Sequence, residues 1–413
     1  MPRDLAKIYI TEKAERSLKG GHPWVYGEEV TSVSGEYEQG GTVDIFSKKG
    51  SWLGAGFVND FSKIRVRLIS RNTNDTFDAS FWERRVKYAL AYRKHVCGDL
   101  SVCRLIYGES DGFPGFTVDK YNDIIVTQVL CLGIEKIKDV IYRILTDALA
   151  LENCKVKCII ERCDVPVREK EGLSQFKGFY DPEWMKNARG GRELTAEDAK
   201  TRIFENGIYY DIDCLEGQKT GYFLDQKLNR KAAGEISKGL KVLDCFCNIG
   251  GFSLNCARSG AISVTGADIS PLACSNASSN ASINGLANAE FITVDVFDYL
   301  TELAGKKQHP YDMIILDPPA FTKSRETAKN AYKGYKDINY RAMRILPRGG
   351  YLVSCSCSHF MTVEMFERML QDAATDAGVS LKIVEKRFAA PDHPVTLGIP
   401  ETEYLKCYIM QII

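Results

Sequence analysis

The sequence predicts an α/β fold in which a doubly wound, mostly parallel sheet fills the C-terminal half of the chain. A small β-barrel and an α+β middle unit precede it. Short β-rich runs fill about the first seventy residues, whereas strand-like and helix-like runs alternate from residue 241 onward. Acidic residues and glycines directly follow several of these later strands, as they do where a parallel sheet holds a nucleotide-like ligand.

Three β-rich runs near the N-terminus predict the strands of the barrel, at residues 42–46, 52–58 and 64–69. Glycine turns at 20–21, 40–41 and 54–56 separate these runs from their neighbours. The spacing is typical of a small barrel.

The middle unit begins with a basic helical stretch at 81–95. Strands are predicted at 104–107, 116–119, 124–130 and 157–161, with a turn at 112–115. Between the last two strands, apolar residues recur at spacings of three and four: Ile134, Ile137, Val140, Ile141, Ile144, Leu145, Ala148 and Leu149. Such a stripe predicts an amphipathic helix that lies on the preceding strands.

Residues 166–202 are polar and interrupted by glycine and proline, so we expect a domain boundary there. The predicted domains are residues 1–75, 76–190 and 191–413. Asn206 and Gly207 favour a tight hairpin at the start of the last domain. After it, strands and helices are predicted to alternate at 241–246, 252–258, 263–268, 271–284, 290–294, 311–317, 329–346 and 350–356.

The charges balance, with 54 Lys and Arg against 54 Asp and Glu, which argues against a uniformly basic nucleic acid binder. Two local runs are basic. Residues 61–104 hold ten Lys or Arg against four acids, and residues 323–348 hold eight against two, with tyrosines interleaved. Each run is either a nucleic acid contact or a solvated helix face.

Fourteen cysteines are scattered along the chain, and neither a secretory signal nor a membrane-spanning apolar run accompanies them. We therefore expect reduced thiols and a cytoplasmic location. The pairs Cys245 with Cys247 and Cys355 with Cys357 raise the alternative of a zinc site. We predict no metal, because the spacing is too short for a zinc knuckle and the strand that ends at Asp317 should separate the pairs.

The turn after the first strand of the parallel sheet predicts a ligand site. Asp244 ends that strand, and Asn248, Gly250 and Gly251 follow before a helix, where bare backbone approaches a ligand and helix-start amides hold a carboxylate. The spacing departs from the dinucleotide fingerprint. Asp268 ends the second strand, where an acidic side chain accepts ribose hydroxyls. These residues fit an adenosine with an amino acid tail.

Asp295 ends the third strand, and with Val296 it is placed to contact an adenine ring. The alternative for Asp268 and Asp295 is a loop or helix-cap role.

The next two strands end in residues suited to chemistry on a base. Asp317, Pro318 and Pro319 make a stiff loop that could hold a planar base, on which Phe321 could stack; the alternative is a rigid strand exit. Cys357 lies at the end of the following strand. Carbon 5 of cytosine becomes nucleophilic only after a thiolate adds at carbon 6, so Cys357 is the candidate nucleophile, and Asp317 would share a proton with ring nitrogen 3.

These motifs together resemble the bacterial ribosomal RNA large-subunit cytosine-5 methyltransferase family with an N-terminal PUA domain. The resemblance covers nearly the whole chain. Residues 19–26 are similar to the start of that PUA domain, and 104–115 and 161–168 resemble its middle domain. In the last domain the resemblance is carried by 217–226, 317–321, 356–358 and 391–395. It implies a class I methyltransferase domain with a seven-stranded, mostly parallel sheet, S-adenosylmethionine as cofactor and 23S ribosomal RNA or its precursor as partner. Dimerisation stays open.

The resemblance also implies that residues 217–226 lie over the cofactor before the first strand. The expected cofactor-binding residues are Lys219, Thr220, Tyr222, Asp225, Gln226, Arg230, Asp244, Phe246, Asn248, Gly250, Gly251, Phe252, Asp268, Ser270, Asp295, Val296 and Asp317. The expected substrate-binding residues are Pro318, Pro319, Phe321 and Lys323, and the expected catalytic residues are Cys357 and Asp317.

One position departs from the related enzymes. Many RNA cytosine-5 methyltransferases carry a second cysteine after the proline of the base motif, where this chain has Pro319. The base that removes the carbon 5 proton is therefore unassigned. His359 follows the nucleophile motif, and its effect on the thiol is open.

Two other functions compete with cytosine-5 methylation. Methylation of an exocyclic base nitrogen uses a similar acidic or amide residue followed by Pro-Pro and an aromatic, but it would not need Cys357. An RNA-binding assembly factor would keep the donor pocket without catalysis, which the complete set of Asp244, Asp268, Asp317 and Cys357 argues against.

Overall fold

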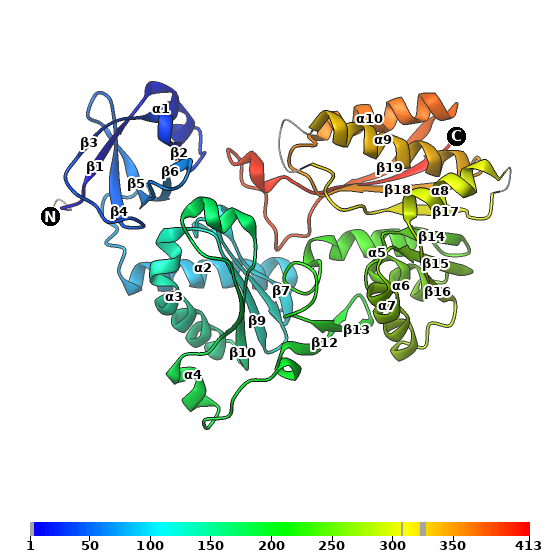
Figure 1. Ribbon diagram of the computed structural model, residues 1–413, viewed down its shortest axis with the longest axis horizontal. Coiled ribbons are helices and arrows are strands. Elements are labelled where there is room, and N and C mark those ends of the chain that lie inside the picture. Colours follow the sequence, from blue (N-terminus) through cyan, green and yellow to red (C-terminus); the bar gives the residue numbers. More distant parts are fainter. Residues whose placement is uncertain (1–3, 307–308, 323–327) are drawn as a thin grey trace. The chain divides into compact units, whose positions relative to one another are not determined.

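The computed structural model describes residues 4–306, 309–322 and 328–413 (Figure 1). The chain divides into two units. The first contains Met1–Ile203, Ile212–Leu224 and Pro391–Pro400, and the second contains Phe204–Asp211, Asp225–Ala390 and Glu401–Ile413. No helix in the described ranges combines the length and the apolar character that crossing a bilayer requires. None of the fourteen cysteines forms a disulfide.

A six-stranded sheet opens the first unit, in the order β2-β6-β5-β4-β1-β3. β2 and β3, at its two ends, are not paired with each other, so the pairing leaves the sheet open. Its elements are β1 (Lys7–Ile10), α1 (Glu12–Lys19), β2 (Trp24–Tyr26), β3 (Val30–Ser34), β4 (Thr42–Ser47), β5 (Trp52–Val58) and β6 (Ile64–Ser70). The three strands predicted from apolar runs are confirmed, whereas β1, β2, β3 and α1 were not predicted.

A five-stranded sheet of order β11-β10-β9-β8-β7 completes the first unit. It comprises β7 (Val102–Tyr107), β8 (Phe116–Tyr121), β9 (Ile124–Val129), β10 (Cys158–Cys163) and β11 (Phe176–Tyr180), with α2 (Ala79–Cys97), α3 (Leu132–Leu151) and α4 (Glu183–Ala188). The predicted amphipathic helix is α3, and its stripe packs in the core of this sheet except for Val140, which is exposed. The polar segment 166–202 was expected only to link domains, but it also supplies β11 and α4.

The second unit is built on a seven-stranded sheet of order β16-β15-β14-β17-β18-β20-β19. The first five of these strands are parallel, and β20 is antiparallel to both of its neighbours. The strands are β14 (Lys241–Cys245), β15 (Ser263–Asp268), β16 (Ala289–Thr293), β17 (Met313–Leu316), β18 (Tyr351–Ser356), β19 (Leu381–Arg387) and β20 (Lys406–Ile412). The helices are α5 (Lys227–Ile236), α6 (Gly251–Arg258), α7 (Pro271–Ile283), α8 (Val296–Gly305), α9 (Ala328–Ile345) and α10 (Val363–Ala377).

Both faces of the central part of this sheet are buried, because alternate residues of β14, β15, β17, β18 and β20 enter different cores. On β14, Leu243 packs in the core formed with α8, α9 and α10, while Val242 packs in the core formed with α5 and α6. β17 lies between β14 and β18, so the predicted separation of the two cysteine pairs is confirmed. A hairpin of β12 (Lys200–Glu205) and β13 (Ile208–Asp213) turns at Asn206 and Gly207, as predicted.

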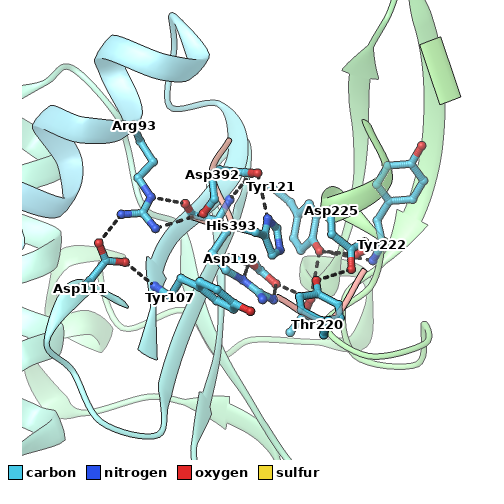
Figure 2. Close-up of polar contacts among 12 residues, drawn as sticks. Arg93, Tyr107, Asp111, Asp119, Tyr121, Thr220, Tyr222, Asp225, Asp392 and His393 are labelled. Carbon is cyan, nitrogen blue, oxygen red and sulfur yellow. Dashed lines mark hydrogen bonds and ion pairs between the residues drawn. The ribbon is translucent and has the colours of Figure 1, made fainter. Parts of the chain in front are cut away.

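Residues 391–400 belong to the first unit although they follow β19 in the chain. The Asp392 Oδ2 accepts a hydrogen bond from the Arg104 amide at 2.9 Å, and its carbonyl accepts one from the Arg93 Nη2 at 3.0 Å (Figure 2). Burial would raise the pKa of Asp392, but the adjacent His393 and the Arg104 bonds lower it. Residues 391–395 are therefore held by contacts to α2 and β7.

Arg93 is the centre of this network. Its side chain is fully buried, and it donates to the Arg104 carbonyl at 2.9 Å and to Asp111 at 2.6 Å (Figure 2). A buried guanidinium needs such partners, because desolvating an uncompensated charge costs several kcal/mol. The network therefore ties α2, β7 and residues 391–400 into one unit.

Replacing Arg93 should destabilise the first unit. Arg93→Met removes the partner of the Asp111 carboxylate and of the Arg104 and Asp392 carbonyls, so we expect the free energy of unfolding to fall by about 3–5 kcal/mol. All four tryptophans of the chain lie in the first unit, so tryptophan fluorescence in a urea titration reports on that unit alone.

The matched control is Arg84→Met on the same helix. The Arg84 side chain is 45% exposed and pairs with Asp75 at 2.9 Å, so its loss should cost about 0–1 kcal/mol. An equal loss in the free energy of unfolding for Arg93→Met and Arg84→Met would contradict a stabilising role of the buried network.

Candidate active site

The candidate site lies at the carboxyl edge of the parallel strands in the second unit. β14 is the first of these strands in the chain, and its neighbours are β15 on one side and β17 on the other. Strand order therefore reverses between β14 and β17, the position where open α/β sheets bind ligands. Asp244 pairs in register with Gly266 on β15 and with Ile315 on β17.

Asp244 is almost completely buried at this edge, with 1% of its surface exposed. Its Oδ2 accepts hydrogen bonds from the Ser253 amide at 2.9 Å and the Ser253 hydroxyl at 2.6 Å, whereas its Oδ1 accepts none from any described residue. Burial raises the pKa of Asp244 to about 7, with the charges of Asp317 and Asp268 adding to the effect and Ser253 opposing it. A buried acceptor without a partner is costly, so a ligand that donates to Oδ1 fits here.

The turn after β14 has a left-handed backbone at three positions. Phe246, Asn248 and Gly250 have positive φ angles of 65°, 49° and 86°. A Cβ at Gly250 would lie 3.2–3.3 Å from Leu254, Phe291 and Ala277. A side chain there would also be strained by the positive φ angle. The left-handed backbone and the close packing at Gly250 both favour glycine there, and a ligand role for this turn stays a prediction.

Several predicted ligand residues instead have local structural contacts. Phe252 packs in the α5–α6 core, and Arg230 is buried with its guanidinium on Glu205 at 2.7 Å. Ser270 caps α7, and Asp295 caps α8 through hydrogen bonds from the Phe297 and Asp298 amides at 2.8 and 3.3 Å. The helix-cap alternative for Asp295 is thus observed, although its second carboxylate oxygen accepts no hydrogen bond from described residues. Val296 is buried in the core on the α8 side.

Asp268 lies at the end of β15, half-buried. It accepts the Asn248 amide on Oδ2 and the Ser270 amide on Oδ1, both at 3.0 Å. Since a carboxylate oxygen has two lone pairs, each still has acceptor capacity for a ligand hydroxyl.

Asp317 follows β17 and is held by the buried Gln226, whose Nε2 donates to its Oδ1 at 3.0 Å. Asn229 fixes Gln226 in turn by donating to its Oε1 at 2.7 Å. Asp225 accepts a hydrogen bond from the Tyr404 hydroxyl at 2.5 Å. Sequence reasoning missed Asn229 and Tyr404, because neither lies in a recognisable motif.

The base loop and the cysteine loop are linked by a hydrogen bond. The Ser358 hydroxyl donates to the Thr322 carbonyl at 3.1 Å, joining the residue after Cys357 to the residue after Phe321. Pro318 is buried and Pro319 exposed. The Phe321 ring packs on Tyr335 at 4.5 Å and on Phe297 at 5.9 Å between centroids. Lys323, a predicted substrate residue, lies outside the described residues.

Cys357 differs from the other cysteines near this edge. Cys245, Cys247 and Cys355 are buried, and burial raises the pKa of each thiol. Cys355 also lies opposite Cys407 in the β18–β20 register. Cys357 follows the end of β18 and is half-buried. Of the four, it is therefore the thiol best placed to react with a substrate.

Three predicted cofactor residues belong to the first unit. The Thr220 hydroxyl donates to Asp119 at 2.6 Å, and the Tyr222 carbonyl accepts the Tyr121 hydroxyl at 2.9 Å (Figure 2). The Lys219 ammonium lies 4.4 Å from the centre of the Phe223 ring. A cofactor role for these residues stays a prediction.

Most cations of the basic run 61–104 are used within the first unit. Six of the ten form ion pairs: Arg65, Arg67, Arg84, Arg93, Lys94 and Arg104. Arg71 and Arg85 donate to backbone carbonyls. The run therefore serves the fold more than a nucleic acid surface. Among described residues, no group of three or more His, Cys, Asp or Glu could hold a metal.

Comparison with known protein families identifies two regions. Residues 8–71 match a family of PUA-like domains, and residues 180–403 match a family of S-adenosylmethionine-dependent methyltransferases. The second match covers more than half of the chain.

Relatives named ribosomal RNA large subunit methyltransferase I are similar over nearly the full length. The protein of Shewanella denitrificans is 38% identical over 98% of this chain and 99% of its own. That of Photobacterium profundum is 38% identical over 97% and 99%, and that of Pseudoalteromonas atlantica is 37% identical over 99% and 100%.

Two solved structures share the fold. One is a protein assigned as a methyltransferase and complexed with SAH, with a TM-score of 0.81 and 21% identity over 98% of this chain and 99% of the other. The second, assigned as a SAM-dependent methyltransferase from Streptococcus mutans, has a TM-score of 0.79 and 22% identity over the same shares.

The raised pKa of Asp244 predicts a pH-dependent effect on stability. A carboxyl whose pKa rises on folding keeps its proton more tightly in the folded state, so its ionisation opposes folding. This free-energy cost of ionising Asp244 is absent below the ordinary aspartate pKa near 4 and complete above about pH 7. Asp244→Asn removes this cost, so the stability of the variant relative to wild type should rise from pH 5 to pH 8, by at most about 3 kcal/mol.

Urea titrations followed by far-ultraviolet circular dichroism at the two pH values measure this difference. Glu235→Gln, an exposed change on α5, is the control and should show no pH-dependent gain. An Asp244→Asn gain of equal size at both pH values would contradict the shifted ionisation.

Proposed function

The chain belongs to the S-adenosylmethionine-dependent methyltransferase family that includes ribosomal RNA large subunit methyltransferase I, and from this premise we propose that it methylates carbon 5 of a cytosine in large-subunit ribosomal RNA. One observation carries the cytosine-5 assignment. Asp317 and Cys357 follow adjacent parallel strands, and the Ser358 to Thr322 hydrogen bond ties their loops together. A carboxyl for the base and a thiol for covalent attack are thus placed at one edge.

The cofactor site is proposed along β14, β15 and β16. S-adenosylmethionine, when bound, supplies a methyl group on a positively charged sulfur. The Asp244 Oδ1, a buried acceptor, would accept from the ammonium of its amino acid part, and the turn at Gly250 would admit its carboxylate. The free lone pairs of Asp268 would accept the ribose hydroxyls. Phe246 and Phe297, whose ring centroids lie 6.0 Å apart, would border the adenine.

The proposed reaction begins with the Cys357 thiolate. Its sulfur bonds to carbon 6 of the cytosine, and the electron pair of the carbon 5–carbon 6 bond makes carbon 5 nucleophilic. Asp317, oriented by Gln226, shares a proton with ring nitrogen 3 as this charge develops. Carbon 5 takes the methyl group, and the bonding pair stays with the donor sulfur.

Loss of the carbon 5 proton to a base re-forms the double bond between carbon 5 and carbon 6 and expels the Cys357 thiolate from carbon 6. No residue is assigned as that base. Pro319 occupies the place of the second cysteine that assists product release in many related enzymes.

The ribosomal RNA substrate is supported by the relatives' names and by the PUA-like domain over residues 8–71. An unstacked cytosine in a loop or single strand is the expected target, because the reacting carbons are covered in a duplex. A cytoplasmic location fits such a substrate and fourteen cysteines without a disulfide.

Replacing Cys357 tests the covalent mechanism. Transfer of labelled methyl to protein-free large-subunit ribosomal RNA should fall at least 1,000-fold in Cys357→Ala, an order expected for loss of a covalent nucleophile (~10³ or more). Cys355→Ala, which changes a buried thiol two residues away, should keep activity within about tenfold. The product is identified by nucleoside mass spectrometry.

Full activity in Cys357→Ala would remove the covalent mechanism and favour methylation of an exocyclic nitrogen. No transfer by the wild type, to free RNA or to ribosomal particles, would favour a non-catalytic RNA-binding factor.

Replacing Asp244 tests the cofactor site. Asp244→Asn keeps the size of the side chain but loses the charge that would bind an ammonium. We expect the Kd for S-adenosylmethionine to rise about 10- to 150-fold at pH 8, the range for a charged hydrogen bond. Isothermal titration calorimetry measures it, with Glu235→Gln as the control. An unchanged Kd would place the amino acid part elsewhere.

A further inference from the structure

Lys406 is a buried lysine that the reaction above does not use. It lies at the start of β20 in an otherwise apolar run, and only 1% of its surface is exposed. Its ammonium donates to the Ser358 carbonyl at 2.6 Å and to the Tyr404 carbonyl at 2.8 Å. Two carbonyls compensate poorly for the desolvation of a full charge, so a lysine here needs a further reason.

Lys406 lies beside the proposed nucleophile. In the antiparallel pairing of β18 with β20 it is opposite Ser356, the residue before Cys357, and its ammonium holds the carbonyl of the residue after Cys357. That carbonyl also accepts the Met361 amide at 3.2 Å. The backbone on both sides of Cys357 is therefore fixed by contacts that include this lysine.

The charges around Lys406 point to the thiol. Burial lowers the pKa of Lys406 to about 8, and the charges of Cys357 and then Glu403 oppose that shift. Other ionisable groups in this region are Asp317 after β17, Tyr335 on α9 and His359, two residues after Cys357 in the chain. Burial and the Cys357 charge raise the pKa of Tyr335, so it stays protonated.

A thiolate next to a cation forms more readily, because the two charges attract in a site that excludes water. A free cysteine titrates near pH 8.5, so only a few per cent is thiolate at neutral pH. An opposite charge within a few ångströms shifts such an equilibrium by about 1–3 pH units. The two groups then titrate as a coupled pair.

We propose that Lys406 is a positioning residue that fixes the Cys357 loop through the Ser358 carbonyl and supplies the positive charge that favours the Cys357 thiolate. At neutral pH the thiol proton leaves to solvent, the S–H bonding pair stays on sulfur, and Lys406 keeps its three protons. The catalytic consequence rests on the proposed function, in which Cys357 is the nucleophile. The effect on the thiol itself can be measured without RNA or cofactor.

The test is the rate of Cys357 alkylation by iodoacetamide across pH 5–10 in the full-length protein. Cys97 and Cys154 are the other cysteines that are not fully buried, so a Cys97→Ser, Cys154→Ser background leaves Cys357 as the accessible thiol. In Lys406→Met the midpoint of the rate profile should move up by about one pH unit, and the rate at pH 7 should fall about tenfold. Peptide mass spectrometry confirms the site of reaction.

Two further variants separate charge from position. Lys406→Arg keeps the charge and should keep the midpoint, whereas Lys406→Gln keeps a hydrogen-bond donor without charge and should shift it as Lys406→Met does. Lys382→Met, at an exposed position on β19, is the matched control and should leave the profile unchanged. If circular dichroism shows that Lys406→Met does not fold, the alkylation profiles of Lys406→Arg and Lys406→Gln test the proposal without it.

A Lys406→Gln profile that coincides with wild type overturns the proposal. Its failure is distinguishable from failure of the cytosine-5 function. Loss of methyl transfer in Cys357→Ala with no alkylation shift in Lys406→Gln keeps the function and removes the role of Lys406. A clear alkylation shift together with full activity in Cys357→Ala keeps the lysine–thiol interaction and removes the covalent mechanism.

Discussion

The reversal of strand order between β14 and β17 is the constraint on which the candidate site depends. Because the chain enters the sheet at β14 and then builds outward in both directions, the loops after β14 and β17 diverge at one edge. The first loop exposes backbone and the buried Asp244, and the second presents Asp317. β18 adds Cys357 next to them. Residues more than 100 positions apart thus meet because parallel pairing aligns the ends of their strands.

Buried charges in the two units fall into two kinds. Arg230 and Glu205 neutralise each other within the second unit, and so do Arg93 and Asp111 within the first. Asp244 and Lys406 have no such ionic partner among the described residues, only hydrogen bonds to neutral groups. The buried ion pairs stabilise the fold. Within the described ranges, Asp244 and Lys406 are instead buried without a counter-ion, at positions where a ligand or a reacting group would supply the opposite charge.

The sequence was most informative where local pattern decides structure. From 241 to 356 the strands and helices other than α8 were predicted close to their observed bounds, because a strand buried on both faces is a continuous apolar run and each helix follows a turn signal. The helix α8 was not predicted. β19 and β20 escaped prediction. β20 inserts between β18 and β19 in antiparallel orientation, and such a choice of partner depends on contacts across about fifty residues that no local pattern encodes.

The same limit applies to the site. Strand ends and motifs predicted the positions of Asp244, Asp317 and Cys357. They did not predict which residues the neighbouring side chains would contact. Arg230 binds Glu205 from the hairpin, and Phe252 faces a core, although both were expected at the cofactor. A side chain's partner is set by tertiary packing, so a motif identifies the loop more reliably than the role of each residue in it. A lysine within the apolar run after Leu405 was the available signal for Lys406.

The contribution of residues 391–400 to the first unit has a consequence for synthesis on the ribosome. Arg93 and Asp392 are 299 residues apart in the chain. At about 5–20 residues per second, translation separates them by roughly 15–60 s. During that interval the nascent first unit has its sheets but lacks the carbonyl and carboxylate that Asp392 gives to Arg93 and Arg104. Folding of this early-made part therefore finishes only when a late-made segment emerges, and an earlier stop in translation would leave a buried arginine without its full set of acceptors.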